Sequence, residues 1–471
     1  MSSLIRLACL AVLAVPCVAG ADTASDLQAL RDEVQAMRAQ YEARIRALEA
    51  RVQAAEGAGA GSSVSVPTSA TATAATAPTP GNAAVPAATA TAAPSASGTG
   101  FNPALSLVLS GLYTRASRDP ASYRISGIAL PPNVQVGPGT RGFSLAESEL
   151  GFSANIDPWL SGSANLSFHP DNTVSVEEAF VQTTSLGNGL TLRGGRFLSS
   201  IGYLNSQHSH VWDFADAPLA YQAFLGTQVA DDGVEVAYLA PTDLFLELRG
   251  AVGRGRSYPG TDSSRNGSGM TSLALHAGGD AGESSSWRAG VSVLDAKADG
   301  QRVTSLNPSF MPRTDAFMGS TRVWIADAVW KWAPNGNATR TNFKLQGEYL
   351  RSTRDGTLVA DVDGIASAAP YRAAQSGWYV QGVYQFMPRW RVGLRTERLD
   401  VNPAGYGGNA SLFGVEAWNP RKNSAMLDFS PSEFSRIRLQ YAQDRARPGP
   451  VDHQWFLQYQ MSLGAHGAHS Y

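Results

Sequence analysis

The sequence predicts an all-β fold, a transmembrane antiparallel β-barrel of about sixteen strands, preceded by an α-helical coiled coil and a disordered linker. Three observations support this prediction. From residue 101 onward, short segments alternate apolar and polar residues between turn residues. The connections between these segments alternate between short and long. Tryptophans gather near the ends of the segments, where a membrane interface would lie.

Composition excludes several classes of protein. The chain has 471 residues, of which 16% are charged and 43% hydrophobic. Beyond the first twenty residues, no run of about 18 apolar residues could cross a bilayer as a helix. The net charge of −2 provides no field that would attract nucleic acid, so no nucleic-acid partner is expected.

Residues 1–20 read as a secretory signal peptide. Arg6 precedes an apolar run at 7–15, and the small residues at 18–20 suit a signal peptidase. Pro16 stands where a lipoprotein would need a small residue before Cys17. Both cysteines, Cys9 and Cys17, lie in this segment, so the mature chain would have none, as suits an oxidising periplasm.

Residues 21–56 are predicted to form a periplasmic coiled coil. Apolar residues recur there at spacings of three and four with one stutter, at Leu27, Leu30, Val34, Met37, Tyr41, Ile45, Leu48 and Val52. The narrow seam favours self-association over a lone amphipathic helix, and the number of helices stays open. Residues 57–100 are rich in Ala, Thr and Pro and carry no charge, so they form a linker that cannot fold alone.

Residues 101–471 make up the predicted barrel. Its clearest hairpin spans 149–169, where Leu150, Phe152 and Ala154 alternate with polar residues before a turn at 157–159. The predicted strands are 104–114, 143–156, 160–169, 174–184, 191–202, 233–240, 244–254, 270–278, 286–295, 322–332, 341–351, 377–386, 390–398, 423–430, 434–443 and 453–463. Short turns fall on one rim, and long loops such as 115–142, 296–321 and 352–376 fall on the other.

Tryptophan positions test the barrel independently. The short-turn rim would hold Trp159, Trp287, Trp330, Trp332 and Trp390, and the long-loop rim Trp324, Trp378 and Trp455. Such belts form at membrane interfaces.

The polar face of each strand is expected to line the lumen, because nothing in lipid can satisfy polar groups. The predicted inward charges are Glu147, Glu149, Glu247, Arg249, Arg288, Asp327, Lys331, Lys344, Glu348, Arg391, Arg395, Glu397, Asp428, Arg436 and Arg438. A lumen this wide that carries charges of both signs predicts a water-filled pore.

Residues 203–227 are expected to fold into the lumen as the third long loop. This stretch has no sustained period and carries Asp213 and Asp216. They would face four arginines, Arg391, Arg395, Arg436 and Arg438, across a constriction with a transverse field. Glu147, Glu149 and Arg249 complete the predicted constriction. The alternative is a set of luminal salt bridges that only stabilise the wall.

His208 and His210, followed by Asp213 and Asp216, offer nitrogen and oxygen ligands for Zn²⁺. The tail holds His466 and His469. Ordinary hydrogen bonding in the lumen is the alternative, and no other cofactor is expected.

The order of signal peptide, coiled coil, linker, sixteen strands and folded third loop resembles trimeric Gram-negative porins. VEEAFVQT at 176–183 and LRGGRFLSSIGYLN at 192–205 are similar to the phosphate-selective porin O and P type. The block at 205–226, NSQHSHVWDFADAPLAYQAFLG, resembles barrels labelled zinc-regulated outer-membrane receptors. These resemblances imply a homotrimer in contact with outer-membrane lipid that passes small hydrophilic solutes or ions.

Three functions follow as hypotheses. The first is a passive diffusion channel of the cell outer membrane in a Gram-negative bacterium. The second is a metal uptake receptor, although an energised receptor needs a plug and about 22 strands. The third is a structural barrel tethering the envelope through the coiled coil. No catalytic residues are predicted, because a lipid-facing Ser near a His is lacking on the apolar faces.

Overall fold

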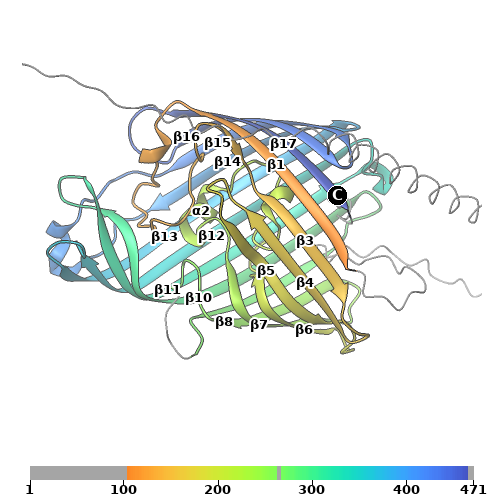
Figure 1. The fold of residues 1–471 in the computed structure, drawn as a ribbon, viewed down its shortest axis with the longest axis horizontal. Coiled ribbons are helices and arrows are strands. Elements are labelled where there is room, and N and C mark those ends of the chain that lie inside the picture. Colours follow the sequence, from red (N-terminus) through yellow and green to blue (C-terminus); the bar gives the residue numbers. More distant parts are fainter. Residues whose placement is uncertain (1–102, 262–266, 465–471) are drawn as a thin grey trace, which may run out of the picture. The chain divides into compact units, whose positions relative to one another are not determined.

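A computed structural model describes residues 103–261 and 267–464. The predicted signal peptide (1–20), coiled coil (21–56), linker (57–100) and the last residues of the tail lie outside the described residues. Within them, one antiparallel sheet closes on itself because the first strand pairs with the last, Ser106 facing Gly464 (Figure 1).

The strands of this sheet are β1 (Ala104–Ala116), β2 (Gly142–Leu145), β3 (Ser148–Asn155), β4 (Leu160–Phe168), β5 (Val174–Thr183), β6 (Leu190–Leu198), β7 (Ala230–Leu239), β8 (Phe245–Gly253), β9 (Met270–Asp280), β10 (Ser285–Leu306), β11 (Pro312–Trp332), β12 (Asn342–Ala360), β13 (Ser367–Met387), β14 (Trp390–Val401), β15 (Arg421–Ser432), β16 (Ser435–Arg445) and β17 (Asp452–Gly464).

Strands β2 and β3 together occupy one position in the barrel, next to β1. β2 pairs with the end of β1 at Gly111–Thr114, and β3 pairs with its start at Ala104–Val108. Between them the register shifts by one residue, with Gly111 opposite Leu145 and Val108 opposite Glu149. β2 and β3 therefore form one interrupted strand, and the closed barrel of sixteen strands is confirmed.

Two hairpins are much longer than predicted. β10 to β13 contain 22, 21, 19 and 21 residues, so the predicted loops at 296–321 and 352–376 are wrong. Only residues 307–311 and 361–366 turn the chain. Cross-strand ion pairs, such as Arg322 with Asp295 at 2.8 Å, accompany the extended pairing. The backbone hydrogen bonds between β10 and β11 and between β12 and β13 continue into these polar segments, because strand pairing does not depend on contact with lipid.

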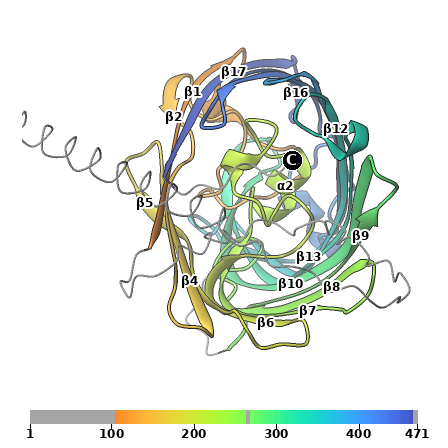
Figure 2. The same ribbon diagram turned by 90° about the vertical axis from the view of Figure 1, so that its right-hand side faces the viewer.

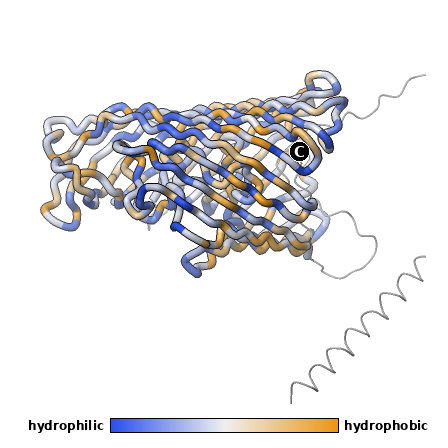
Figure 3. Tube along the Cα trace, turned by 90° about the horizontal axis from the view of Figure 1, so that it is seen from above, coloured by the Kyte–Doolittle hydropathy of each residue, from blue (hydrophilic) through white to orange (hydrophobic). Residues whose placement is uncertain are grey.

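The outer face of the barrel is apolar. Leu105, Leu109 and Leu457 are exposed on β1 and β17, and hydrophobic positions alternate with hydrophilic ones along the strands (Figure 3). Near the short turns, the rings of Trp390 and Phe429 stack at 4.6 Å. Such an outward apolar face, with aromatic residues toward its edges, is typical of a barrel that spans a membrane.

The lumen is not polar throughout, which corrects the expectation for the inward faces. On β10 to β14 the inward positions become apolar part of the way along the strand, as at Leu294, Ile325, Leu350 and Leu399. They pack against the short helix α2 (Leu219–Leu225), which lies inside the ring of strands (Figure 2). An inward residue that contacts protein instead of water can be apolar.

Further segments cover α2 on the long-loop side. Ile125 and Leu130 of the first long loop join the same buried cluster. The Gly137 N–H donates to Gln222 Oε1 at 2.8 Å, and the hydroxyl of Tyr258 donates to the carbonyl of Ala223 at 3.0 Å. Sequence reasoning gave only residues 203–227 an inward course, and these segments were missed.

The other helical segments are short 3-10 helices. They are η1 (Pro120–Ser122), η2 (Ser209–Val211), η3 (Pro334–Gly336) and η4 (Gly407–Leu412). Within the described ranges, each helix is too short or too polar to cross a membrane.

Candidate functional site

The candidate site is the luminal loop, residues 203–227, together with the two charged walls that it touches. Its neck is closed by Asn205, whose amide donates to the carbonyls of Ser199 (2.7 Å) and Val229 (3.0 Å). The Asn205 side-chain oxygen accepts from the Val229 N–H at 2.8 Å. One buried side chain thus joins the strand ends on both sides of the loop.

Glu348 on β12 anchors the loop from the opposite wall. Its carboxylate accepts hydrogen bonds from the N–H groups of Tyr203 (3.2 Å) and Leu204 (3.0 Å). The hydroxyls of Tyr221 (2.7 Å) and Tyr379 (2.6 Å) also donate to it. Because Tyr221 belongs to α2, one carboxylate fixes both the entry of the loop and its helix.

We call the inward cations of β12 and β14 to β16 the basic wall: Lys344, Arg391, Arg395, Lys422, Arg436 and Arg438. Asp213 of the loop forms ion pairs with Lys344 and with Arg391, the latter at 3.2 Å. The amide of Gln381 donates to the same carboxylate at 3.2 Å. Asp213 is therefore held by two cations of the basic wall and by Gln381.

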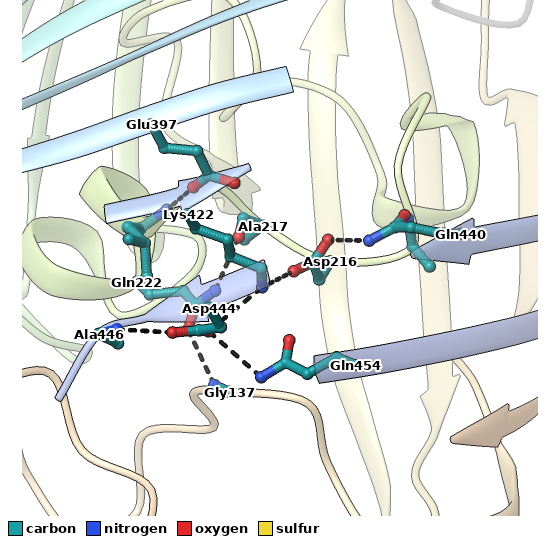
Figure 4. Close-up of polar contacts among 12 residues, drawn as sticks. Gly137, Asp216, Ala217, Gln222, Glu397, Lys422, Gln440, Asp444, Ala446 and Gln454 are labelled. Carbon is teal, nitrogen blue, oxygen red and sulfur yellow. Dashed lines mark hydrogen bonds and ion pairs between the residues drawn. The ribbon is translucent and has the colours of Figure 1, made fainter. Parts of the chain in front are cut away.

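Asp216 meets the basic wall one step further along the loop. Arg395 Nη2 donates to its carboxylate at 2.7 Å, and so does the amide of Gln440, also at 2.7 Å. Lys422 contacts the other carboxylate oxygen and lies 3.6 Å from Asp444, so its ammonium group sits between two aspartates (Figure 4).

The remaining two arginines bind the loop backbone. Arg436 donates to the carbonyl of His210 at 2.7 Å, and Arg438 donates to the carbonyl of Trp212 at 2.9 Å. All four predicted arginines thus contact the loop. However, they touch it directly, so the transverse field expected between Asp213, Asp216 and the arginines has no open gap to cross.

Both aspartates stay ionised against the effect of burial. Burial alone would raise the pKa of Asp213, but the charges of Lys344 and Arg391 outweigh it and hold the pKa below its ordinary value. Burial likewise opposes ionisation of Asp216, and Lys422 and Arg395 lower its pKa in the same way.

The second wall is acidic and consists of Glu147, Glu149, Glu177 and Glu178. In β5 a register shift sets Asn165 opposite Glu178 and Leu166 opposite Val176, so Glu177 is an extra residue. Such a bulge lets neighbouring side chains share one face, and the two adjacent glutamates both reach the lumen. Glu147 lies in the break between β2 and β3.

The two histidines of the loop lie against this acidic wall. His208 Nδ1 is 3.1 Å from Glu149 and 3.2 Å from Glu177, and its Nε2 is 3.0 Å from Glu178. His210 Nδ1 is 3.2 Å from Glu149. Asp213 and Asp216, which the sequence offered as further ligands, instead bind the basic wall, and glutamates lie beside the histidines.

The carboxylates also change the acidity of His208. Burial would lower the pKa of this imidazole, but the charge of Glu177 and the nearby carboxylates of Glu149 and Glu178 raise it above its ordinary value.

Arg249 lies away from the loop's aspartates. It pairs with Glu235 of the neighbouring strand β7 at 2.9 Å and with Glu247 of its own strand β8 at 2.8 Å. It belongs to a ring of inward cations near the short-turn ends of their strands, which we call the short-turn cations: Arg193, Arg249, Arg288, Lys331, Lys344, Arg391 and Arg436.

Sequence reasoning missed several residues of the site. Lys422 was outside the predicted strand 423–430, because β15 begins two residues earlier, at Arg421. Alternation along the strand, extended by those residues, could have found it. Glu177 and Glu178 gave no such signal, because a period of two places only one of two adjacent residues inward.

The fold and the loop define a class: a transmembrane β-barrel whose lumen holds an inward-folded loop fixed between an acidic and a basic wall. No protein-family model matches the chain. A relative described as an uncharacterized protein of Aquifex aeolicus (strain VF5) is 31% identical over 354 residues, 70% of this chain and 70% of the relative. The chain belongs to the family of that protein.

Solved structures with a similar course of the chain include three outer-membrane proteins. In-vitro folded OmpT of Vibrio cholerae, in a trimer form, has a TM-score of 0.48 and 10% identity, covering 77% of this chain and 99% of that one. The outer membrane channel DcaP of Acinetobacter baumannii has 0.45 and 12%, covering 78% and 99%. An anion-selective porin from Comamonas acidovorans has 0.47 and 11%, covering 77% and 100%. The resemblances to phosphate-selective porins and zinc-regulated receptors are not confirmed and stay predictions.

Proposed function

We propose that this barrel is a passive diffusion channel of the outer membrane for small hydrophilic solutes, with a preference for anions. The observation that carries the proposal is an asymmetry within some of the luminal ion pairs. In the pairs of Arg391 and Arg249, the cation faces the luminal water while the carboxylate is buried behind it.

Three pairs show this asymmetry. The side chain of Arg391 is 26% exposed, whereas its partners Asp213 and Asp428 are 4% and 0% exposed. The side chain of Arg249 is 23% exposed, whereas that of Glu235 is 3% exposed. An ion in the lumen therefore approaches a positive group first, although the net charge of each pair is small.

The position of these cations adds to the effect. The short-turn cations line the lumen from β6 to β16, and Lys344, Arg391 and Arg436 among them also contact the luminal loop. Low-dielectric walls focus the field of such charges within a lumen. Such a field raises the local concentration of anions. The neighbouring carboxylates Glu235, Glu247 and Asp428 are buried and act mainly through their arginine partners.

Single-channel recording in planar bilayers tests this function. The proposal predicts a steady current without an energy source and a reversal potential in a salt gradient that indicates anion preference. A barrel that tethers the envelope, or a receptor that needs an energy source, would give no steady current. Absence of current from correctly folded protein would therefore refute the proposal.

We further propose that the channel assembles as a homotrimer, registered by the predicted coiled coil at 21–56. Light scattering of detergent-solubilised protein should then give three copies. A monomer whose mass per particle is unchanged on deletion of residues 22–56 would contradict both the assembly and the role of the coiled coil. Stable dimers would contradict the number alone.

A further inference from the structure

The acidic wall and the loop histidines bring together several nitrogen and oxygen atoms that could bind a metal ion. One ligand atom from each of Glu149, His208 and His210 lies within 4.8 Å of the others, and Glu147, Glu149, Glu177 and His208 form an overlapping group. The two imidazole rings stack with centroids 5.5 Å apart. Two strands and one loop therefore direct nitrogen and oxygen atoms toward a common point.

Glu149 supplies an independent observation. It is only 6% exposed, and its Oε2 atom lies 3.1 Å from Nδ1 of His208 and 3.2 Å from Nδ1 of His210. Yet within the described residues no donor is directed at this oxygen with hydrogen-bond geometry. A buried oxygen without a directed donor is costly unless another partner satisfies it.

The spacing suits a small divalent cation. Zinc binds nitrogen and carboxylate oxygen at 2.0–2.2 Å in a tetrahedron, so its ligand atoms stand about 3.3 Å apart. The contacts of 3.1 and 3.2 Å between Glu149 and the two histidines are close to that separation. Imidazole with carboxylate is a donor set that zinc accepts readily, whereas calcium and magnesium prefer oxygen alone.

Charge favours the same ligand. The acidic wall brings four carboxylates together against two imidazoles, which favours a cation there. The side chain of His208 is 21% exposed, so an ion in the lumen can reach the cluster.

We propose that Glu149, His208 and His210, with a further oxygen from Glu177 or Glu147, form a binding site for a divalent transition-metal ion of the zinc type. Bound there, the ion joins the luminal loop to the acidic wall on β3 and β5. This connection is the counterpart of the ion pairs that join Asp213 and Asp216 to the basic wall.

Zinc titration of the full-length protein, followed by isothermal calorimetry, tests the site directly. All variants carry His466→Ala and His469→Ala, so that the tail contributes no ligand. We expect one zinc ion per chain, and binding weakened by at least about tenfold in Glu149→Gln and in His208→Asn. His169→Asn is the matched control, because that exposed histidine bonds Ser175 away from the cluster.

Circular dichroism establishes that each variant is folded, and Glu149→Asp, which keeps an oxygen ligand, should retain more affinity than Glu149→Gln. Zinc bound equally by wild type and Glu149→Gln would overturn the site. Loss of binding in His169→Asn as well, or no binding by the wild type, would also overturn it.

Current through single channels provides a second readout. Zinc should reduce the current of the wild type but not that of the variant with His208→Asn and His210→Asn. If the channel conducts steadily and zinc neither binds nor alters the current, the metal site is refuted and the diffusion function stands. If zinc binds but correctly folded protein passes no current, the metal site stands and the diffusion function is refuted.

Discussion

The luminal loop meets two walls of opposite charge, and they hold it differently. At the basic wall, Asp213 and Asp216 each accept hydrogen bonds from several side chains, and Lys422 is wholly buried between Asp216 and Asp444. At the acidic wall, carboxylates outnumber imidazoles, and Glu149 Oε2 lies close to two nitrogens without a directed donor. On the basic side both loop carboxylates are paired within the protein, whereas the acidic side has capacity left for a cation.

The difference has a structural cause. The basic wall uses long side chains at alternating positions of regular strands, so each cation can reach the loop in an ordinary rotamer. The acidic wall depends on two irregularities, the bulge at Glu177 and the break at Glu147, which concentrate like charges. Like charges brought together require a counterion or protons.

The largest effect is expected from removing the part of the loop that touches both walls. Deleting residues 208–217 should raise the single-channel conductance severalfold, because the closed neck at Asn205 remains while the lumen is widened. Deleting residues 307–311 at the tip of the β10–β11 hairpin is the control and should leave conductance unchanged.

The next largest effect is expected on the unfolding free energy, when an ion pair of the basic wall is removed. Asp216→Asn removes the nearer carboxylate beside Lys422, whose side chain is 0% exposed, and leaves Asp444 at 3.6 Å. We expect urea unfolding in lipid vesicles to show a loss of about 3–5 kcal/mol, because a buried ion pair is broken by removal of one partner. Asp232→Asn, which breaks a half-exposed pair with Arg196, should cost only about 0–1 kcal/mol. Equal losses in both variants would show that the basic wall does not hold the loop.

Selectivity should respond to cations inside the lumen and not to cations outside it. Arg391→Gln together with Lys344→Gln should move the reversal potential toward cations. Arg302→Gln together with Arg322→Gln, which changes two exposed arginines paired on the long hairpins, should not. A shift produced equally by both pairs would indicate a general effect of net charge.

The smallest effect is expected from a change at the acidic wall in metal-free protein. Glu149→Gln removes one of several like charges, so metal-free protein should keep its conductance and change its unfolding free energy by less than the Asp216→Asn variant. A loss as large as that of Asp216→Asn would mean that the imidazole contacts of Glu149 already hold the loop without an ion.

Alternating polarity was sufficient to predict the barrel, the short-turn rim and the inward course of strands such as β14 and β16. It misjudged the reach of β10 to β13, because alternation beyond the membrane gives no sign of where a hairpin turns. Arg391, Arg395, Arg436 and Arg438 were placed on the correct face because each lies in a regular strand.

The acidic half of the site could not be predicted in the same way. Glu177 and Glu178 share the lumen only because of a bulge, which depends on pairing with β4 and leaves no pattern in the sequence. The histidines were noticed as candidate ligands, but the carboxylates beside them lie far earlier in the chain. Glu178 precedes His208 by thirty residues, and Glu149 lies further still. Proximity in sequence therefore pointed to Asp213 and Asp216 instead.

Amide hydrogen exchange over residues 203–227 tests most directly whether the loop is fixed inside the lumen. The amides of Leu204 and Ala215, which donate to Glu348 and Gln440 on the walls, should exchange far more slowly than those of the exposed turn at 307–311. Asp216→Asn should speed exchange at Ala215 and leave Leu204 protected. If the amides of the loop exchange as fast as the exposed turn in the wild type, the loop is not held by either wall, and the account is wrong.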